Sequence, residues 1–394
     1  MTAALLQRGS WLEGLLAAHP TAPENSRRQL QEQGLPQARQ EDWRFTDLGP
    51  LLALDPAALQ PRPGLESPLA LFPDGDVVRL HLDDRGIGLQ PTVGSAPLPE
   101  GLSLEPAQSL LTENALLPAR LNGLMSGPCL QLSLAPAARV RLELWLAPAG
   151  ADALLAPRLL LNLAEGAQLD LAVRLSCRGS SLALPWVEAH LAAGAGLNEA
   201  WLLQGDASDV LLGGCSVQQA QGSRYCRSSV VQGWALARQE PQVLQSQGAA
   251  HTQLRDLAIT TAQAVHDLHS RVRFEGPEGT LDQLQKALVD ESGHSIFNGS
   301  VQVPQLAQRT DAAQLSRHLL LSERAKVDTK PELEIVADDV RCTHGATVSS
   351  LADEELFYLR SRGIDRATGA ELLRRGFCAE ILRELPPLLA QEVA

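Results

Sequence analysis

The residues best suited to do chemistry are a thiol and an imidazole two positions apart, in the stretch Cys342-Thr343-His344. If this stretch is a β-strand, side chains at i and i+2 lie on one face, so both groups would reach the same site. Thiolate is the usual ligand of an iron–sulfur cluster, and imidazole replaces it in some clusters. One such pair is a weak signal, and the pattern alone favours a buried structural cysteine beside a hydrogen-bonded histidine.

Two further groups of histidines lie in strand-like sequence. His266 and His269 are three positions apart, so they would be neighbours on a helix but would face opposite sides on a strand. His251 would share a face with Arg255. We interpret all three histidines as structural or surface residues.

Other thiols and carboxylates carry weaker signals. Cys215 and Cys226 fall in successive strand-like runs, and we expect core thiols rather than a redox pair. Asp338-Asp339 could bind a cation, but acidic residues just before a strand more often form a turn. The six cysteines are Cys129, Cys177, Cys215, Cys226, Cys342 and Cys378. None form a CxxC pair, which argues against a zinc module or a disulfide framework and favours a reducing compartment, the cytoplasm or an organelle stroma.

Motifs of common enzymes are absent from the sequence. There is no GxxxxGK[ST] loop, no GxGxxG between a strand and a helix, no GxSxG elbow and no HExxH pair. We therefore expect a non-catalytic protein, and any ATP hydrolysis coupled to it should be done by another protein.

Charge and hydropathy exclude two kinds of partner. The formal net charge is −13 and no basic stripe is present, which argues against a nucleic-acid binder. No stretch approaches the roughly 18 apolar residues of a membrane span, and the N-terminus lacks the features of a secretory signal. We expect no membrane association.

Strands must position these side chains. Apolar and polar residues alternate in 130–134, 140–146, 159–163 and 169–173, which is the period of a β-strand. Small-residue turns then recur at Gly166, Gly194, Gly222 and Gly248, in steps of 28, 28 and 26 residues. Strands repeated at this interval without helices indicate a solenoid, or a sandwich of stacked hairpins, which periodicity alone does not exclude.

Helical sequence flanks this β-rich body. We divide the chain into a helical region at 1–48, a lead-in of strands and loops at 49–129, the repeated β-region at 130–350, and a helical region at 351–394. In the last region, the acidic run 353–355 suits the first turn of a helix and Gly363 breaks that helix. Asp365 should cap a second helix, closed by Pro386-Pro387.

A long ordered string in the C-terminal third resembles the SufB/SufD family of iron–sulfur cluster assembly proteins. The string comprises Phe297-Asn298-Gly299, Ala307-Gln308-Arg309-Thr310-Asp311-Ala312, Leu319-Leu320-Leu321-Ser322-Glu323, Val327-Asp328-Thr329-Lys330-Pro331-Glu332-Leu333-Glu334-Ile335, residues 337–348 and Leu356-Phe357-Tyr358-Leu359-Arg360-Ser361-Arg362-Gly363-Ile364, with Trp43-Arg44-Phe45-Thr46-Asp47 near the N-terminus. The segment Cys342-Thr343-His344-Gly345-Ala346-Thr347 resembles the SufD branch of the family rather than the SufB branch. Ser349 stands where the family usually has glycine, which questions the geometry of a turn there.

The resemblance implies a fold and a set of partners. It implies a right-handed parallel β-helix core between N-terminal and C-terminal helical regions. Family members of this branch pair with SufB through the β-helix and bind a SufC ATPase through the C-terminal helices, here 351–394. ATP-driven dimerisation of SufC is thought to open the interface at which a nascent cluster forms.

The resemblance also implies roles for particular residues. The family's functional histidine corresponds to His344, expected as a ligand of a transient iron–sulfur cluster at the partner interface, with Cys342 as a second candidate. The SufC-docking surface would include Phe357, Tyr358, Arg360 and Arg362, whose alternative role is ordinary helix packing, expected at least for Phe357. We expect no cluster on the isolated chain, and the sequence leaves open whether that chain pairs with itself.

Two other functions compete with this interpretation. The chain could complete the SufB–SufC assembly as a purely structural strut, in which case changing His344 would affect only the stability of the complex. A β-helical enzyme acting on polysaccharides is less favoured, because such enzymes present grouped acidic residues and this sequence has only scattered ones.

Overall fold

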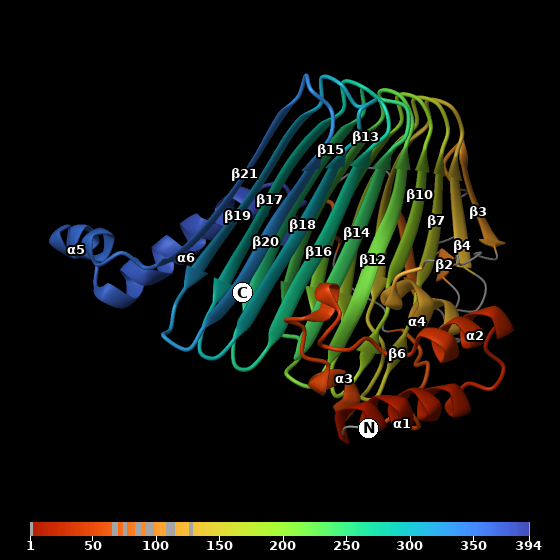
Figure 1. The fold of residues 1–394 in the computed structure, drawn as a ribbon, viewed down its shortest axis with the longest axis horizontal. Helices are drawn as coiled ribbons and strands as arrows, with labels where there is room; N and C mark the ends of the chain where they lie inside the picture. Colours follow the sequence, from red (N-terminus) through yellow and green to blue (C-terminus); the bar gives the residue numbers. More distant parts are fainter. Residues whose placement is uncertain are drawn as a thin grey trace.

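The chain folds into a parallel β-solenoid flanked by helices (Figure 1). The computed structural model describes residues 3–64, 70–73, 77–82, 89–91, 98–107, 115–125 and 129–393. The gaps fall mostly in the expected lead-in, and the side chain of Cys129 also lies outside the described residues. Successive strands of the core alternate between two sheets, and each strand pairs in parallel with the strand one coil away. Hairpin partners in a sandwich would be antiparallel, so the solenoid interpretation is confirmed.

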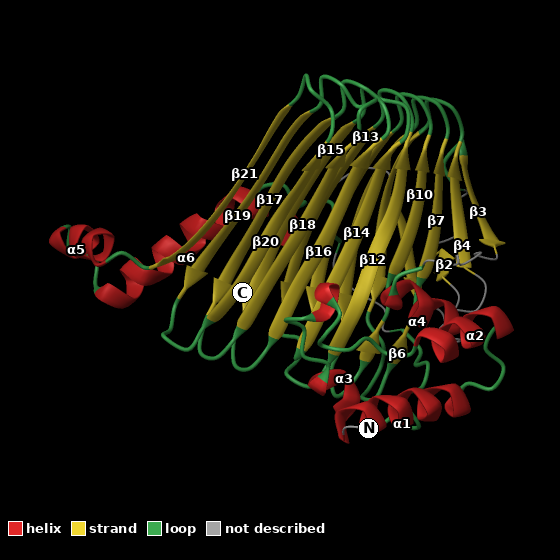
Figure 2. Ribbon diagram, viewed as in Figure 1, coloured by secondary structure: helices red, strands yellow, loops and turns green. Residues whose placement is uncertain are grey.

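The two sheets run the length of the solenoid (Figure 2). The first sheet contains, in spatial order, β2 (Leu89–Pro91), β1 (Val77–Leu82), β5 (Arg139–Leu146), β8 (Gln168–Ser176), β11 (Gly196–Gln204), β13 (Arg224–Gln232), β15 (His251–Thr260), β17 (Thr280–Val289), β19 (Asp311–Leu320) and β21 (Arg341–Ser350). The second sheet contains β3 (Leu102–Ala107), β4 (Cys129–Leu134), β7 (Arg158–Leu163), β10 (Trp186–Leu191), β12 (Val210–Gln219), β14 (Leu236–Gln245), β16 (Val265–Phe274), β18 (His294–Val303) and β20 (Lys326–Ile335), with β6 (Leu154–Leu155) and β9 (Leu182–Ala183) beside them. The repeated region thus ends at Ser350.

The turn glycines behave as the repeat predicts. Gly166, Gly194, Gly222 and Gly248 all have positive φ, a conformation that glycine adopts without a steric penalty. Later coils are longer, since Asp311 pairs with Arg341 thirty residues on. Their turns also place other residues at positive φ, among them Glu291 and Arg309, which explains why the glycine repeat fades after Gly248.

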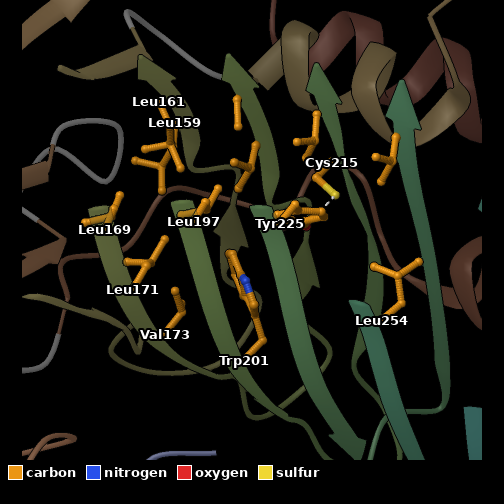
Figure 3. Packing of buried hydrophobic residues seen from close by; sticks show 14 of the residues in the cluster. Leu159, Leu161, Leu169, Leu171, Val173, Leu197, Trp201, Cys215, Tyr225 and Leu254 are labelled. Atoms are coloured by element: carbon orange, nitrogen blue, oxygen red, sulfur yellow. Dashed lines mark hydrogen bonds between the residues drawn. The ribbon is translucent and has the colours of Figure 1, made fainter. Parts of the chain in front are cut away.

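The solenoid interior is filled by side chains from alternate positions of the strands. Stacked leucines such as Leu169, Leu171 and Leu197 are fully buried between the two sheets, together with Trp201 (Figure 3). In-register stacking places like residues over one another from coil to coil, so each coil covers the apolar surface of the previous one.

Helices of the N-terminal part cover the outer face of the second sheet. They are α1 (Ala3–Ala18), α2 (Glu24–Gln33), the 3₁₀ turn η1 (Glu41–Trp43), α3 (Gly49–Ala53) and α4 (Leu117–Met125). Leucines of α1 and α2, such as Leu15 and Leu30, pack with Leu212 and Leu236 of the sheet. Within 49–129, where we expected a lead-in of strands and loops, the helices α3 and α4 were missed. All nine residues of α4 are buried, so it lacks the polar face that reveals a helix in sequence.

A buried ion network fixes the N-terminal segment to the second sheet. Arg238 of β14 donates from Nη1 to Oδ2 of Asp267 on β16 (2.7 Å) and from Nε to Oε1 of Glu240 (2.6 Å). Its Nη1 also reaches the carbonyl oxygen of Asp42 (2.8 Å), and Trp43 lies over the guanidinium with its ring centroid 3.7 Å from Cζ. A charge this deeply buried needs such partners, so the segment around Trp43 is held by the sheet.

Helices at the other end of the chain cover the outer face of the first sheet. Ile381 of α6 (Arg366–Leu382) and Leu389 of α7 (Pro387–Ala390) are fully buried against Val230 and neighbouring residues of the strands. As predicted, Asp365 caps α6, accepting from the amides of Ala367 and Thr368. A third helix, α5 (Asp353–Ser361), stands away from the strands, at the opposite end from β3 and β4 (Figure 1).

We expect Asp267→Ala to lower the free energy of unfolding by about 3 kcal/mol, because Arg238 loses a buried counter-ion. Burial alone would raise the pKa of Asp267, but Arg238, His269 and Thr46 outweigh burial and lower it to about 2. The carboxylate therefore stabilises the fold fully above its unfolded pKa of about 4, and this stabilisation is lost as pH falls toward 2.

Urea unfolding, followed by tryptophan fluorescence at pH 7 and at acidic pH, measures both effects. Asp282→Ala is the control, since its half-exposed carboxylate pairs with Arg255 at the surface and should contribute less than about 1 kcal/mol. Equal losses in the two variants would contradict the role given to the buried network.

Candidate functional site

The candidate ligands lie on the last coil of the solenoid, formed by β20 and β21. Each of these strands is the final strand of its sheet, paired with β18 and β19 respectively. On the other side, no described strand continues either ladder. We call this surface, made of β20 and β21, the open end.

Cys342 and His344 lie on one face of β21, as the strand alternation predicted, and this face is turned toward the solenoid interior. Cys342 pairs in register with Ala312 of β19 and packs, half-buried, against the solenoid core. His344 lies two residues on, in register with Gln314, and is exposed. Burial raises the pKa of the Cys342 thiol, and the charge of Asp311 raises it further. The thiol is therefore protonated at neutral pH and would need a metal or a nearby cation to act as a thiolate ligand.

The open end also exposes apolar side chains that an inner coil would bury. Ile335 of β20 is 41% exposed and Val348 of β21 is 49% exposed. In the preceding coil the corresponding residues, Val303 and His318, are 1% exposed. An unpaired strand edge beside exposed apolar residues is typical of a surface that binds another chain.

The described thiol and imidazole groups of the open end are too few to hold a cluster by themselves. Iron–sulfur clusters are usually held by four protein ligands, and the open end presents one thiol and one imidazole. Among the described residues no three histidine, cysteine or acidic side chains lie close enough together to hold a metal ion. A cluster at the open end would therefore need further ligands from a second chain.

The four predicted docking residues all lie exposed on or just after α5. Phe357 is 71% exposed and Tyr358 is 58% exposed. Cζ of Arg362 lies over the Tyr358 ring, 5.4 Å from the ring centroid. Arg360 is exposed as well. The expectation that Phe357 would also pack within the helices was wrong, because Leu356, only 2% exposed, takes that role.

The other histidines have structural surroundings. His266 is buried between Oγ1 of Thr260 (3.0 Å from Nδ1) and the carbonyl oxygen of Trp234 (3.3 Å from Nε2). Burial lowers its pKa to about 4, so the ring is neutral. Nε2 of His269 lies 3.0 Å from Oδ1 of Asp267, and Nδ1 of His251 lies 2.8 Å from Oγ1 of Thr280. The structural interpretation of all three is confirmed.

Cys215 and Cys226 do not meet, because Cys215 of β12 faces the interior while Cys226 of β13 points to the outer side of its sheet. Cys215 is a core thiol as expected, but Cys226 is only partly buried, and Nε of Arg224 donates to its sulfur (3.1 Å). The expectation of a core position was wrong for Cys226, which lies at an outward position of β13.

The structure also tests the turn expected at Asp338-Asp339 and the turn questioned at Ser349. Asp338 and Asp339 lie in the turn between β20 and β21, as expected. Ser349 lies within β21, so no turn is required there.

Sequence reasoning missed a group of polar residues inside the solenoid. Tyr225 donates to Oε2 of Glu199 (3.0 Å) and lies 3.4 Å from the Cys215 sulfur (Figure 3), while Arg227 pairs with Asp256. Burial raises the pKa of Glu199 and that of Asp256. Strand alternation could have shown that Glu199 faces inward between Leu197 and Trp201.

These side chains surround a cavity of about 20 Å³, lined by Glu199, Trp201, Cys215, Arg227 and Gln239 among others. That volume suffices for a single water molecule. The group therefore belongs to the interior packing rather than to an accessible site.

The fold is a parallel β-solenoid whose last described coil carries the half-buried Cys342 and the exposed His344. The model of the family described as "SUF system FeS cluster assembly, SufBD core domain" matches residues 146–377. This match spans more than half of the chain, and the chain belongs to that family.

Individual relatives agree with the family match. The chain is 43% identical over 171 residues to an iron–sulfur cluster assembly SufBD family protein of Synechocystis, covering 43% of this chain and 38% of that protein. It is 41% identical over 134 residues to the iron–sulfur cluster assembly protein SufD of Escherichia coli, covering 34% of this chain and 31% of the relative. The matched segments thus span about a third of the relatives' own lengths.

No helix in the described part of the chain is both long and apolar enough to span a membrane.

Proposed function

We propose that this chain is a non-catalytic subunit of a SUF iron–sulfur cluster assembly scaffold, working in the cytoplasm or an equivalent reducing compartment. It pairs with a SufB-like subunit through the open end, and His344 serves as a ligand of the nascent cluster there. The observation that carries the proposal is the position of His344: an exposed imidazole on the last, uncovered coil of a SufBD-family solenoid.

The incomplete ligand set fits this role. A single chain with four thiolates would hold a cluster tightly, whereas a site completed by a partner's ligands loses them when the interface opens. Cys342 is the second candidate, and its raised pKa favours a protonated thiol until a metal is bound.

The helix α5 is the proposed docking site of a SufC-like ATPase. Two aromatic side chains and two arginines are exposed on it or just after it, and these residue types dominate binding energy at protein interfaces. The hairpin of α5 and α6 is anchored to the solenoid through α6, where Lys286 of β17 binds Glu380 (2.6 Å) and the carbonyl oxygen of Phe377 (2.9 Å). A motion of the bound ATPase would thus be transmitted to the strands.

We expect His344→Ala to lower the yield of assembled cluster by about tenfold or more, because the site loses a ligand. The yield is measured as iron and acid-labile sulfide in the purified three-protein complex, reconstituted without oxygen. His190→Ala, at an exposed position on β10, is the control and should leave the yield unchanged. An intact His344→Ala complex with normal yield would show instead that the chain is a structural strut.

We also expect the double variant Phe357→Ser and Tyr358→Ser to weaken binding of the ATPase by at least about tenfold, since each aromatic residue buries apolar area at the interface. Isothermal titration of the ATPase into this chain measures the affinity. Leu306→Ser is the matched control, because Leu306 is 77% exposed on a solenoid turn away from α5. Equal affinity of both variants would place the docking site elsewhere.

A further inference from the structure

A buried glutamine lies directly beneath His344. Gln314 of β19 is the register partner of His344 in the parallel ladder, and both occupy interior-facing positions. Register partners on adjacent strands are only about 5 Å apart. Gln314 is 2% exposed although β19 lies directly next to β21 of the open end.

The amide group of Gln314 takes part in a chain of hydrogen bonds with side chains deeper in the solenoid. Its Nε2 donates to Oε1 of Gln283 (3.0 Å), and Nε2 of Gln283 donates to Oγ of Ser270 (2.7 Å). The donor end of Gln314 is thus committed toward the interior. Its acceptor, Oε1, is buried and has no hydrogen-bond partner among the described residues. Leaving a buried acceptor without a partner costs about 1–3 kcal/mol, so the site favours an incoming donor.

Neighbouring side chains on the opposite sheet do not supply that donor. Gly299 lies against the amide, where a Cβ atom would be only 2.2 Å from Nε2 of Gln314. Pro331, the register partner of Gly299 on the last coil, has no backbone N–H. The hydroxyl of Thr329 is already paired with Ser316 (2.9 Å). The register places His344, whose imidazole carries a ring N–H, on the strand next to this oxygen.

We propose that Gln314 is a positioning residue for His344: its Oε1 accepts a hydrogen bond from one ring N–H, which fixes a single neutral tautomer. The exposed imidazole reaches the oxygen by rotation of its own side chain, a fast motion. The other ring nitrogen is then unprotonated and available to iron. Histidine ligands generally hold their second nitrogen in such a hydrogen bond. This inference rests on the proposed function for its purpose, but the hydrogen bond itself can be tested without a cluster.

The test is nitrogen NMR of the ¹⁵N-histidine-labelled full chain at about pH 9, where an ordinary imidazole is neutral. The His344 signals are assigned by their loss in His344→Gln. We expect one dominant tautomer in the parent chain, and a ratio of tautomers changed by about fivefold in Gln314→Met. Gln314→Glu keeps an acceptor oxygen and should retain the parent ratio.

Gln285→Met is the matched control. Gln285 is also 2% exposed with a buried unpartnered Oε1, but its register partner is Ser316, so the His344 signals should not change. An unchanged tautomer ratio in folded Gln314→Met would overturn the inference, as would the same change in Gln285→Met.

The outcome is separable from that of the proposed function. If Gln314→Met alters the tautomer ratio while His344→Ala leaves the cluster yield normal, the hydrogen bond stands and cluster ligation fails. If the tautomer ratio is unchanged while His344→Ala abolishes the yield, ligation stands and the positioning role of Gln314 fails.

Discussion

The parallel stacking of coils is the constraint on which the rest of the structure depends. Every strand must pair its backbone groups and cover its inward side chains with the next coil. This works along the core, where Leu169 stacks on Leu197 in register. The last coil has no such successor among the described strands, so β20 and β21 retain unpaired edges and partly exposed inward residues. An uncovered coil of this kind favours the binding of a second chain at this end.

The composition of the interior changes along the solenoid. Early coils place leucine and valine at inward positions, whereas β19 places Gln314, Ser316 and His318 there. These polar inward side chains bring hydrogen-bond donors and acceptors close to Cys342 and His344. The covering helices on the outer faces of both sheets leave this end free.

Much of the fold could be predicted because its signals are local. Glycines such as Gly194 mark turns, and alternation marks strands, so both were found from sequence. The helix α4 was missed, since burial on all sides removes its periodicity. The ion network of Arg238 and Asp267 joins strands to a segment nearly two hundred residues away in sequence, and no local pattern reveals it.

The candidate site was predictable only in part. Strand alternation placed Cys342 and His344 on one face, but their position on the final coil depends on the number of coils and on where the ladder stops. The exposure of Phe357 likewise depends on Leu356 taking the packing position, which spacing does not decide. Gln314 became visible only through its register with His344.

The most direct test of the central claim is to detect the His344 nitrogen on the cluster itself. This chain alone is labelled with ¹⁵N-histidine and assembled with unlabelled partners, and the reduced, paramagnetic cluster is studied by electron–nuclear double resonance. The account predicts a ¹⁵N coupling from an iron-bound imidazole, which disappears in His344→Ala. A cluster formed in normal yield without any ¹⁵N coupling would contradict it.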